Sequence, residues 1–134
     1  MRELDITVLQ KAEKSFAAAL AQRGELEEKY YEVYRAAIIQ NFEFCFELSW
    51  KFMQRWLRAE DDVALEKSPT KKEVFRLAYN YGLIKDASAW NGYLELRNLT
   101  THTYNEHAAD EVYAAADSFC TDFHSFITEL EKKL

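Results

Sequence analysis

The sequence predicts an all-α protein, an antiparallel up-and-down bundle of four to five helices. Apolar residues recur at spacings of three, four and seven along most of the chain, which is the period of a helix with one buried face. No segment shows the sustained alternation of apolar and polar residues that is typical of a half-buried strand. The chain has only 3 glycines and 1 proline, too few for the many turns of an all-β fold.

The first two predicted helices form the N-terminal half of the chain. Residues 4–22 form the first, and Gly24 is placed to end it. Residues 25–58 form a long second helix, followed by a polar loop over residues 59–67. One stripe of the second helix is predicted to be buried: Ile38, Phe42, Cys45, Ser49, Phe52 and Trp56.

Capping residues mark the starts of the next two helices. Ser68 is the predicted N-cap of the third helix, with Pro69 at its first position. Gly82 closes this helix, and Leu83 is placed for the apolar contact that often follows such a glycine. Asp86 then caps a fourth helix.

The last predicted helix starts near Tyr104, because Thr103 and Glu106 have the spacing of a capping box. Its expected core-facing residues recur at helical spacing. They are Val112, Ala115, Phe119, Phe126 and Leu130.

Composition limits the class of protein. A length of 134 residues predicts a single domain over residues 1–134, and 49% hydrophobic with 30% charged residues is a globular composition. Aromatic residues make up 15% of the chain, which indicates a thick core or an interface. The formal net charge of −6 argues against broad nucleic-acid binding but not against a small basic site, so we expect no DNA partner.

The sequence also indicates a location. No run approaches the roughly 20 apolar residues of a membrane span, and the first ten residues lack the apolar stretch of a signal peptide. We therefore expect a cytoplasmic protein without a membrane partner. Cys45 and Cys120 lack metal-type spacing and are interpreted as buried free thiols.

The segment from Arg97 to Tyr104 is the candidate site. An arginine holds phosphate through two hydrogen bonds, a histidine exchanges protons near neutral pH, and a tyrosine offers a hydroxyl for modification. His102 precedes a helix N-terminus, which favours an anion. On an unbroken helix Arg97 and His102 would point about 140° apart. A break at the two intervening threonines would bring them to one cleft, suited to metal-free phosphodiester chemistry.

Structural interpretations compete with this one. A lone arginine and histidine at a helix junction more often cap carbonyls or satisfy a backbone group. Glu43 and Glu47 have the i, i+4 spacing of a shared metal site, but no further ligand follows, so we interpret them as a solvated face. His107 and His124 are interpreted as ordinary surface or satisfied residues.

Five segments carry a family resemblance, and one of them contains the motif Arg-x4-His-x-Tyr. They are residues 40–51, 74–78, 81–84, 90–104 and 108–113. In this order and at these spacings they resemble the nucleotidyltransferase substrate-binding proteins. This family belongs to the HEPN superfamily, and the HepT toxins are close relatives. The motif alone is weakly specific, but the ordered segments are strongly so.

The resemblance implies a helical homodimer whose partner is a minimal, MNT-type nucleotidyltransferase encoded nearby. It also implies metal-independent RNA cleavage, with Arg97 stabilising the charged phosphorane, His102 acting as general base or acid and Asn98 orienting the site. Tyr104 matches the tyrosine that the partner adenylylates to silence the nuclease. ATP or another nucleotide would belong to that partner, and no resident cofactor is expected.

We therefore predict the ribonuclease toxin half of a toxin-antitoxin pair. Two alternatives stay open at this point. The chain could be a non-catalytic accessory subunit that binds substrate or nucleotide for the transferase, or a purely structural helical dimer.

Overall fold

Five α-helices and one short 3-10 turn build the protein in the computed structural model, which describes residues 4–60, 64–102 and 105–134. At position 102 only the backbone is described. These ranges contain no strand, so the all-α prediction is confirmed. The elements are α1 (Thr7–Ala21), η1 (Glu28–Tyr30), α2 (Tyr31–Ala59), α3 (Lys71–Asn80), α4 (Ala87–His102) and α5 (Glu106–Lys132).

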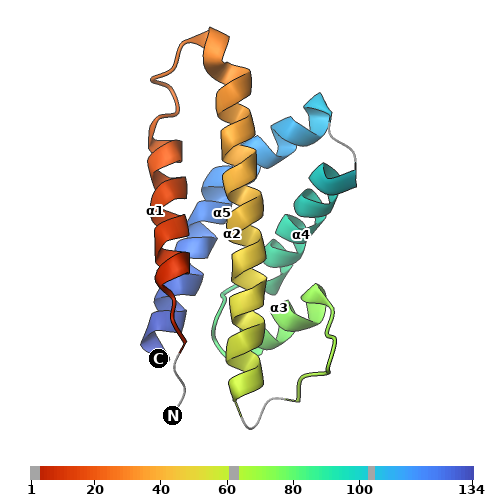
Figure 1. Ribbon diagram of the computed structural model, residues 1–134. Helices are drawn as coiled ribbons and strands as arrows, with labels where there is room; N and C mark the ends of the chain where they lie inside the picture. Colours follow the sequence, from red (N-terminus) through yellow and green to blue (C-terminus); the bar gives the residue numbers. More distant parts are fainter. Residues whose placement is uncertain (1–3, 61–63, 103–104) are drawn as a thin grey trace.

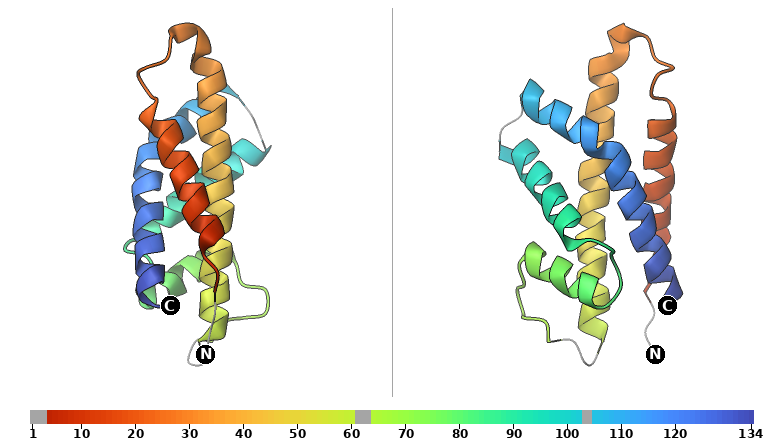
Figure 2. Two further views of the ribbon diagram at one scale, coloured as in Figure 1. Left: turned by 60° about the vertical axis from the view of Figure 1, so that its left-hand side comes forward. Right: turned by 180° about the vertical axis from the view of Figure 1, so that it is seen from behind.

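The four longer helices alternate in direction. In Figure 1, α1 and α4 run upward while α2 and α5 run downward, which is the predicted up-and-down arrangement. The short helix α3 lies in the connection between α2 and α4 and packs against both. Figure 2 shows α4 splaying away from α2 toward its C-terminal end, where α5 begins.

Aromatic side chains fill the centre of this bundle. Trp90 of α4 is buried, and its ring lies 5.6 Å from Phe119 and 5.7 Å from Phe75, measured between centroids. Phe42 of α2 meets Phe119 edge to face at 4.9 Å. Such pairs add to the stabilisation from burial alone. The high aromatic content is therefore explained in large part by the core.

Two helix starts differ from the predictions. The chain around residues 25–30 forms a turn and η1, so α2 begins at Tyr31 instead of residue 25. Helix α3 is capped by Thr70, whose Oγ1 accepts a hydrogen bond from the Glu73 N–H at 3.1 Å, and not by Ser68. Thr70 is favoured because a glutamate stands at the N3 position, which completes the residue pattern of a capping box.

The start of the last helix also differs. Asn105 is the N-cap of α5, and its Oδ1 accepts a hydrogen bond from the Ala108 N–H at 2.8 Å. Asparagine caps at least as well as threonine. The predicted cap Thr103 lies outside the described residues. Within α5, Ala116 is fully buried while the predicted Ala115 is only partly covered.

The predicted helix exits and caps around residues 82–89 are confirmed. Gly82 has a φ of +80°, and the Leu83 N–H donates to the Ala78 carbonyl at 2.8 Å. The buried Leu83 side chain completes the Schellman motif. Asp86 Oδ1 accepts from the Ala89 N–H at 3.2 Å, as predicted for the cap of α4.

The two cysteines are free. Cys45 is buried as predicted, whereas Cys120 is only partly buried. Among the described residues, no helix is both long enough and apolar enough to cross a membrane.

Candidate functional site

Helix α4 continues without a break from Arg97 to His102, so the break at the two threonines that would bring both residues to one cleft does not occur. The hydroxyls of Thr100 and Thr101 donate to the Arg97 carbonyl at 3.0 and 2.8 Å. Back-bonding of this kind lets threonine stay in a helix at small cost. The backbone positions of Arg97 and His102 therefore remain about 140° apart around one helix.

Arg97 is instead held by two carboxylates of α2. Its Nη1 lies 2.9 Å from Glu43 Oε2, and its Nε lies 3.5 Å from Glu47 Oε1. The second contact is an ion pair without hydrogen-bond geometry, because Nε makes no hydrogen bond within the described chain. Only 23% of the Arg97 side chain is exposed. The interpretation of Glu43 and Glu47 as a solvated face is only partly right, because each side chain stays 31% exposed but pairs with Arg97 of α4.

This cluster has a definite electrostatic character. Two carboxylates surround one guanidinium, so the local formal charge is negative although a cation stands at its centre. A phosphate that approaches Arg97 has to compete with Glu43 and Glu47 for its N–H groups. Glu47 also accepts a hydrogen bond from Trp50 Nε1 at 3.1 Å, which fixes its orientation. No group of three or more potential metal ligands occurs among the described residues.

Two other predicted site residues, Asn98 and His102, belong to the C-terminal part of α4. Asn98 is exposed on the helix surface. His102 is the last residue of α4, and its side chain lies outside the described part of the structure. Tyr104 lies outside the described residues altogether. The structure thus leaves the predicted catalytic roles as proposals.

Arg35 is a residue that the sequence reasoning missed. Its guanidinium, 4% exposed as a side chain, lies 2.7 Å from Asp110 Oδ1 and 2.9 Å from Glu106 Oε2. Hydrogen bonds to Asp110 and then to Glu106 raise the pKa of Arg35 well above its ordinary value, against the effect of burial. Arg35 thereby fixes the first turns of α5, directly after the Arg97 to Tyr104 segment. An arginine within an otherwise apolar stretch of a helix was the available indication.

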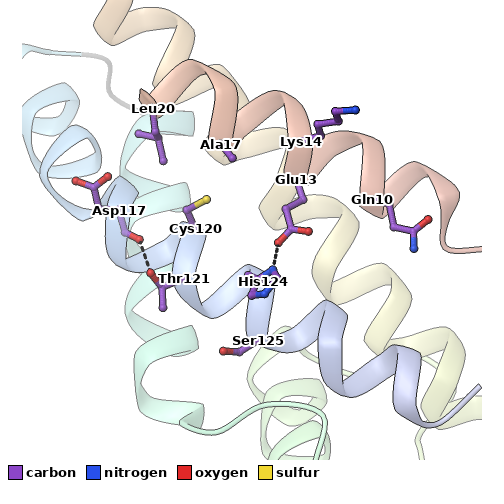
Figure 3. A pocket seen from close by; sticks show the side chains of 10 residues that line it. All are labelled: Gln10, Glu13, Lys14, Ala17, Leu20, Asp117, Cys120, Thr121, His124 and Ser125. Atoms are coloured by element: carbon purple, nitrogen blue, oxygen red, sulfur yellow. Dashed lines mark hydrogen bonds and ion pairs between the residues drawn. The ribbon is translucent and has the colours of Figure 1, made fainter. Parts of the chain in front are cut away.

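A groove of about 660 Å³ lies between α1 and α5 (Figure 3). His124 Nδ1 and Glu13 Oε2 lie 2.5 Å apart across it, so His124 is a satisfied surface residue as predicted. Cys120 also lines the groove. Burial raises the pKa of its thiol, which disfavours the nucleophilic thiolate.

The fold and the Arg97 to Tyr104 segment define the class of protein. A family model described as nucleotidyltransferase substrate binding protein like matches residues 4–132, and the chain belongs to this family.

Particular relatives support this assignment. The chain is 37% identical over 102 residues to a Haemophilus influenzae protein named probable ribonuclease HepT, a match that covers 73% of this chain and 68% of that protein.

Two solved structures share the fold. HI0074 of Haemophilus influenzae superposes with a TM-score of 0.84 at 31% identity and covers 95% of this chain and 99% of its own. It is described as showing the fold of a substrate binding domain of a nucleotidyltransferase. A Thermus thermophilus protein designated ttk003001694 has a TM-score of 0.75 at 32% identity and covers 91% of this chain and 98% of its own.

Proposed function

We propose that this protein is the metal-independent ribonuclease half of a toxin-antitoxin pair, with a minimal MNT-type nucleotidyltransferase as its partner. The observation that carries the proposal is the intact sequence motif formed by Arg97, His102 and Tyr104, in a chain 37% identical to a probable ribonuclease HepT. The family name supports an association with a nucleotidyltransferase.

A homodimer would complete the site. One continuous α4 keeps the backbone positions of Arg97 and His102 on different sides of the helix. If the α4 helices of two protomers lie side by side, Arg97 of one protomer can face His102 of the other. The functional site of this proposal is therefore formed between protomers, with Asn98 on the exposed surface of α4 beside it.

The proposed reaction is an internal transfer at phosphorus. The RNA 2′-hydroxyl gives its proton to His102, and its oxygen forms a new bond to the adjacent phosphorus. The bond between phosphorus and the 5′-oxygen breaks, and that oxygen takes up a proton, leaving a 2′,3′-cyclic phosphate and a 5′-hydroxyl. Arg97 stabilises the extra negative charge of the phosphorane through its N–H groups. None of these roles requires a metal ion.

Glu43 and Glu47 hold the Arg97 guanidinium in place before RNA arrives. Because both carboxylates are partly exposed, solvent weakens their hold on Arg97. A phosphodiester that displaces Glu43 gains two charge-assisted hydrogen bonds in return. The cluster thus orients Arg97 while limiting its affinity for stray anions.

Silencing would occur at Tyr104. Transfer of an AMP group from ATP forms a bond between the tyrosine oxygen and phosphorus, and pyrophosphate leaves. The product carries a negative phosphodiester two residues from His102, where it would repel and block an RNA phosphate.

The test is RNA cleavage by the purified chain in EDTA, with His102→Ala as the site variant. His107→Ala is the matched control, because His107 is an exposed histidine of the neighbouring helix. We expect His102→Ala to lose at least about a hundredfold in rate, as is typical for a general acid or base, while the control cleaves normally. Equal cleavage by wild type and His102→Ala would refute the proposed site.

A non-catalytic accessory subunit is the second candidate function. The engagement of Arg97 by two carboxylates favours it, since that contact alone gives Arg97 a structural role in joining α4 to α2. This candidate predicts no RNA cleavage by the folded chain and a change in transferase activity when the chain is added. A transferase whose rate is identical with and without the chain would exclude it.

A further inference from the structure

The N-terminal end of α2 carries an apolar surface that the other described helices leave largely exposed. Figure 1 shows this end projecting beyond the ends of α1, α4 and α5. Val33 is 73% exposed, and Leu26 and Tyr30 are also exposed. Together with two further residues they line a shallow hollow of about 430 Å³, which we call the α2 patch: Leu26, Tyr30, Val33, Tyr34 and Ala37.

The pattern of the patch indicates a binding face. Four of its residues lie at positions 30, 33, 34 and 37, which is the spacing of one face of a helix. Single exposed apolar residues are ordinary on protein surfaces, but a contiguous apolar helix face marks an interaction site. Tyrosine is also enriched at protein interfaces.

The charges around the patch indicate which kind of partner fits. Residues 25–32 contain four glutamates and one lysine. That lysine, Lys29, lies 3.5 Å from Glu27 Oε2, so its charge is already compensated. A twofold contact between two copies would place this acidic rim against itself, which is unfavourable. A partner with an apolar centre and a rim of lysine or arginine is complementary in both respects.

The first turns of α2, which carry the patch, also contact the start of α5, and α5 follows the proposed modification site Tyr104 in the sequence. Tyr31, beside the patch, donates a hydrogen bond from its hydroxyl to Asp110 Oδ1 at 3.3 Å. Arg35, one turn further along, is paired with Glu106. Glu106 follows Tyr104 by two residues, a stretch of chain that reaches about 7 Å at most. Val33 lies about 160° from Tyr31 and Arg35 around α2, so a protein bound to the patch reaches the start of α5 by extending around the helix.

We propose that the α2 patch is the docking surface for the nucleotidyltransferase partner, and that the partner contributes an apolar face with a basic rim. This inference rests on the proposed function, because the partner is the transferase named there. It adds the surface that the transferase recognises, on the first turns of α2, which also contact the start of α5.

The test measures binding of Val33→Asp to the nucleotidyltransferase encoded beside this chain. Val8→Asp is the matched control, because Val8 is a 41% exposed valine on α1, outside the patch. We expect Val33→Asp to weaken the dissociation constant at least about tenfold, as for a central interface residue, and Val8→Asp to leave it unchanged. Glu25→Lys should slow association several-fold at low salt and less at high salt. Circular dichroism verifies that each variant is folded.

Three results would overturn the inference. The first is binding of Val33→Asp with wild-type affinity. The second is a lower oligomeric state of Val33→Asp by sedimentation without the transferase, which would show that a second copy covers the patch. The third is absence of binding by the wild-type chain, which removes the partner from the proposed function as well. RNA cleavage by Val33→Asp distinguishes loss of the docking surface from loss of the nuclease. A variant that still cleaves RNA but no longer binds the transferase retains the proposed catalytic site.

Discussion

Replacing the buried Arg35 should destabilise the protein less than neutralising the two carboxylates that pair with it. Arg35 is 4% exposed as a side chain, whereas Glu106 is 74% exposed and Asp110 is 58% exposed. Replacing Arg35 by methionine leaves two carboxylates that water can solvate, and the new side chain fills most of the space. Hydrogen bonds to charged groups contribute roughly 1.5–3 kcal/mol each, and solvent screening at the exposed partners lowers this figure. We expect Arg35→Met to lower the free energy of unfolding by about 2 kcal/mol.

Neutralising both carboxylates should lower the free energy of unfolding more than Arg35→Met does, although it changes the side chains less. Glu106→Gln combined with Asp110→Asn keeps the shapes of both side chains but leaves a buried guanidinium without a counter-charge. An unpaired buried charge of this kind costs about 3–5 kcal/mol. The difference of about 2 kcal/mol between the two variants corresponds to a gap of roughly 5–10 °C in melting temperature.

The assay is urea unfolding followed by far-ultraviolet circular dichroism, with the slope of the transition compared between variants. Arg76→Met is the control, because Arg76 forms an exposed pair with Glu73 on one helix and its loss should cost much less stability than the loss of Arg35. If Arg35→Met destabilises the protein as much as the double variant does, burial of the guanidinium is not what determines the cost.

Two further predictions concern other parts of the chain. Gly82→Ala should lower the free energy of unfolding by about 1–2 kcal/mol, because φ is +80° there and an added Cβ would otherwise meet only ordinary contacts. Gly92→Ala, within α4 and with open space around it, should instead raise it by about 0.5–1 kcal/mol, and thermal melts of both compare the signs. Burial raises the pKa of the Cys45 thiol to about 12, so at mildly alkaline pH a thiol reagent should label Cys120 first. Equal labelling rates for Cys45 and Cys120 would contradict this.

Local features of the fold could be predicted from the sequence because their causes lie within a few residues. Gly82 and Leu83 form the predicted Schellman motif, and Asp86 caps α4, since each needs only its own neighbours. The prediction of Ser68 as the cap of α3 was wrong by two residues, because Thr70 is also a good capping residue and Glu73 favours it. Boundaries are the part of a helix that local patterns define least well.

The surroundings of the site could not be predicted because they depend on contacts between distant parts of the chain. The periodicity of α2 shows that Glu43 and Glu47 share a face, but not that α4 brings Arg97 onto that face. Arg35 and Asp110 are 75 positions apart, and nothing in the spacing of either helix pairs them. The continuity of α4 through Thr100 and Thr101 was missed because intrinsic propensity was given more weight than hydroxyl bonds to the Arg97 carbonyl.

The position of α5 in the chain has a consequence for the order of folding. Phe119, Phe123 and Phe126 of this helix complete the core, and α5 packs against α1, α2 and α4. During synthesis the first four α-helices leave the ribosome before α5. Their apolar faces therefore stay exposed until α5 has been made. Pairing α5 with α2 also closes long loops, which slows folding. The same helix anchors its first turns on Arg35, directly after the motif, so the end of α4 acquires a fixed surrounding only in a chain that has been made through α5. A prematurely terminated chain would expose apolar surface and be prone to aggregation. Chaperones and proteases would remove it before its candidate site could act.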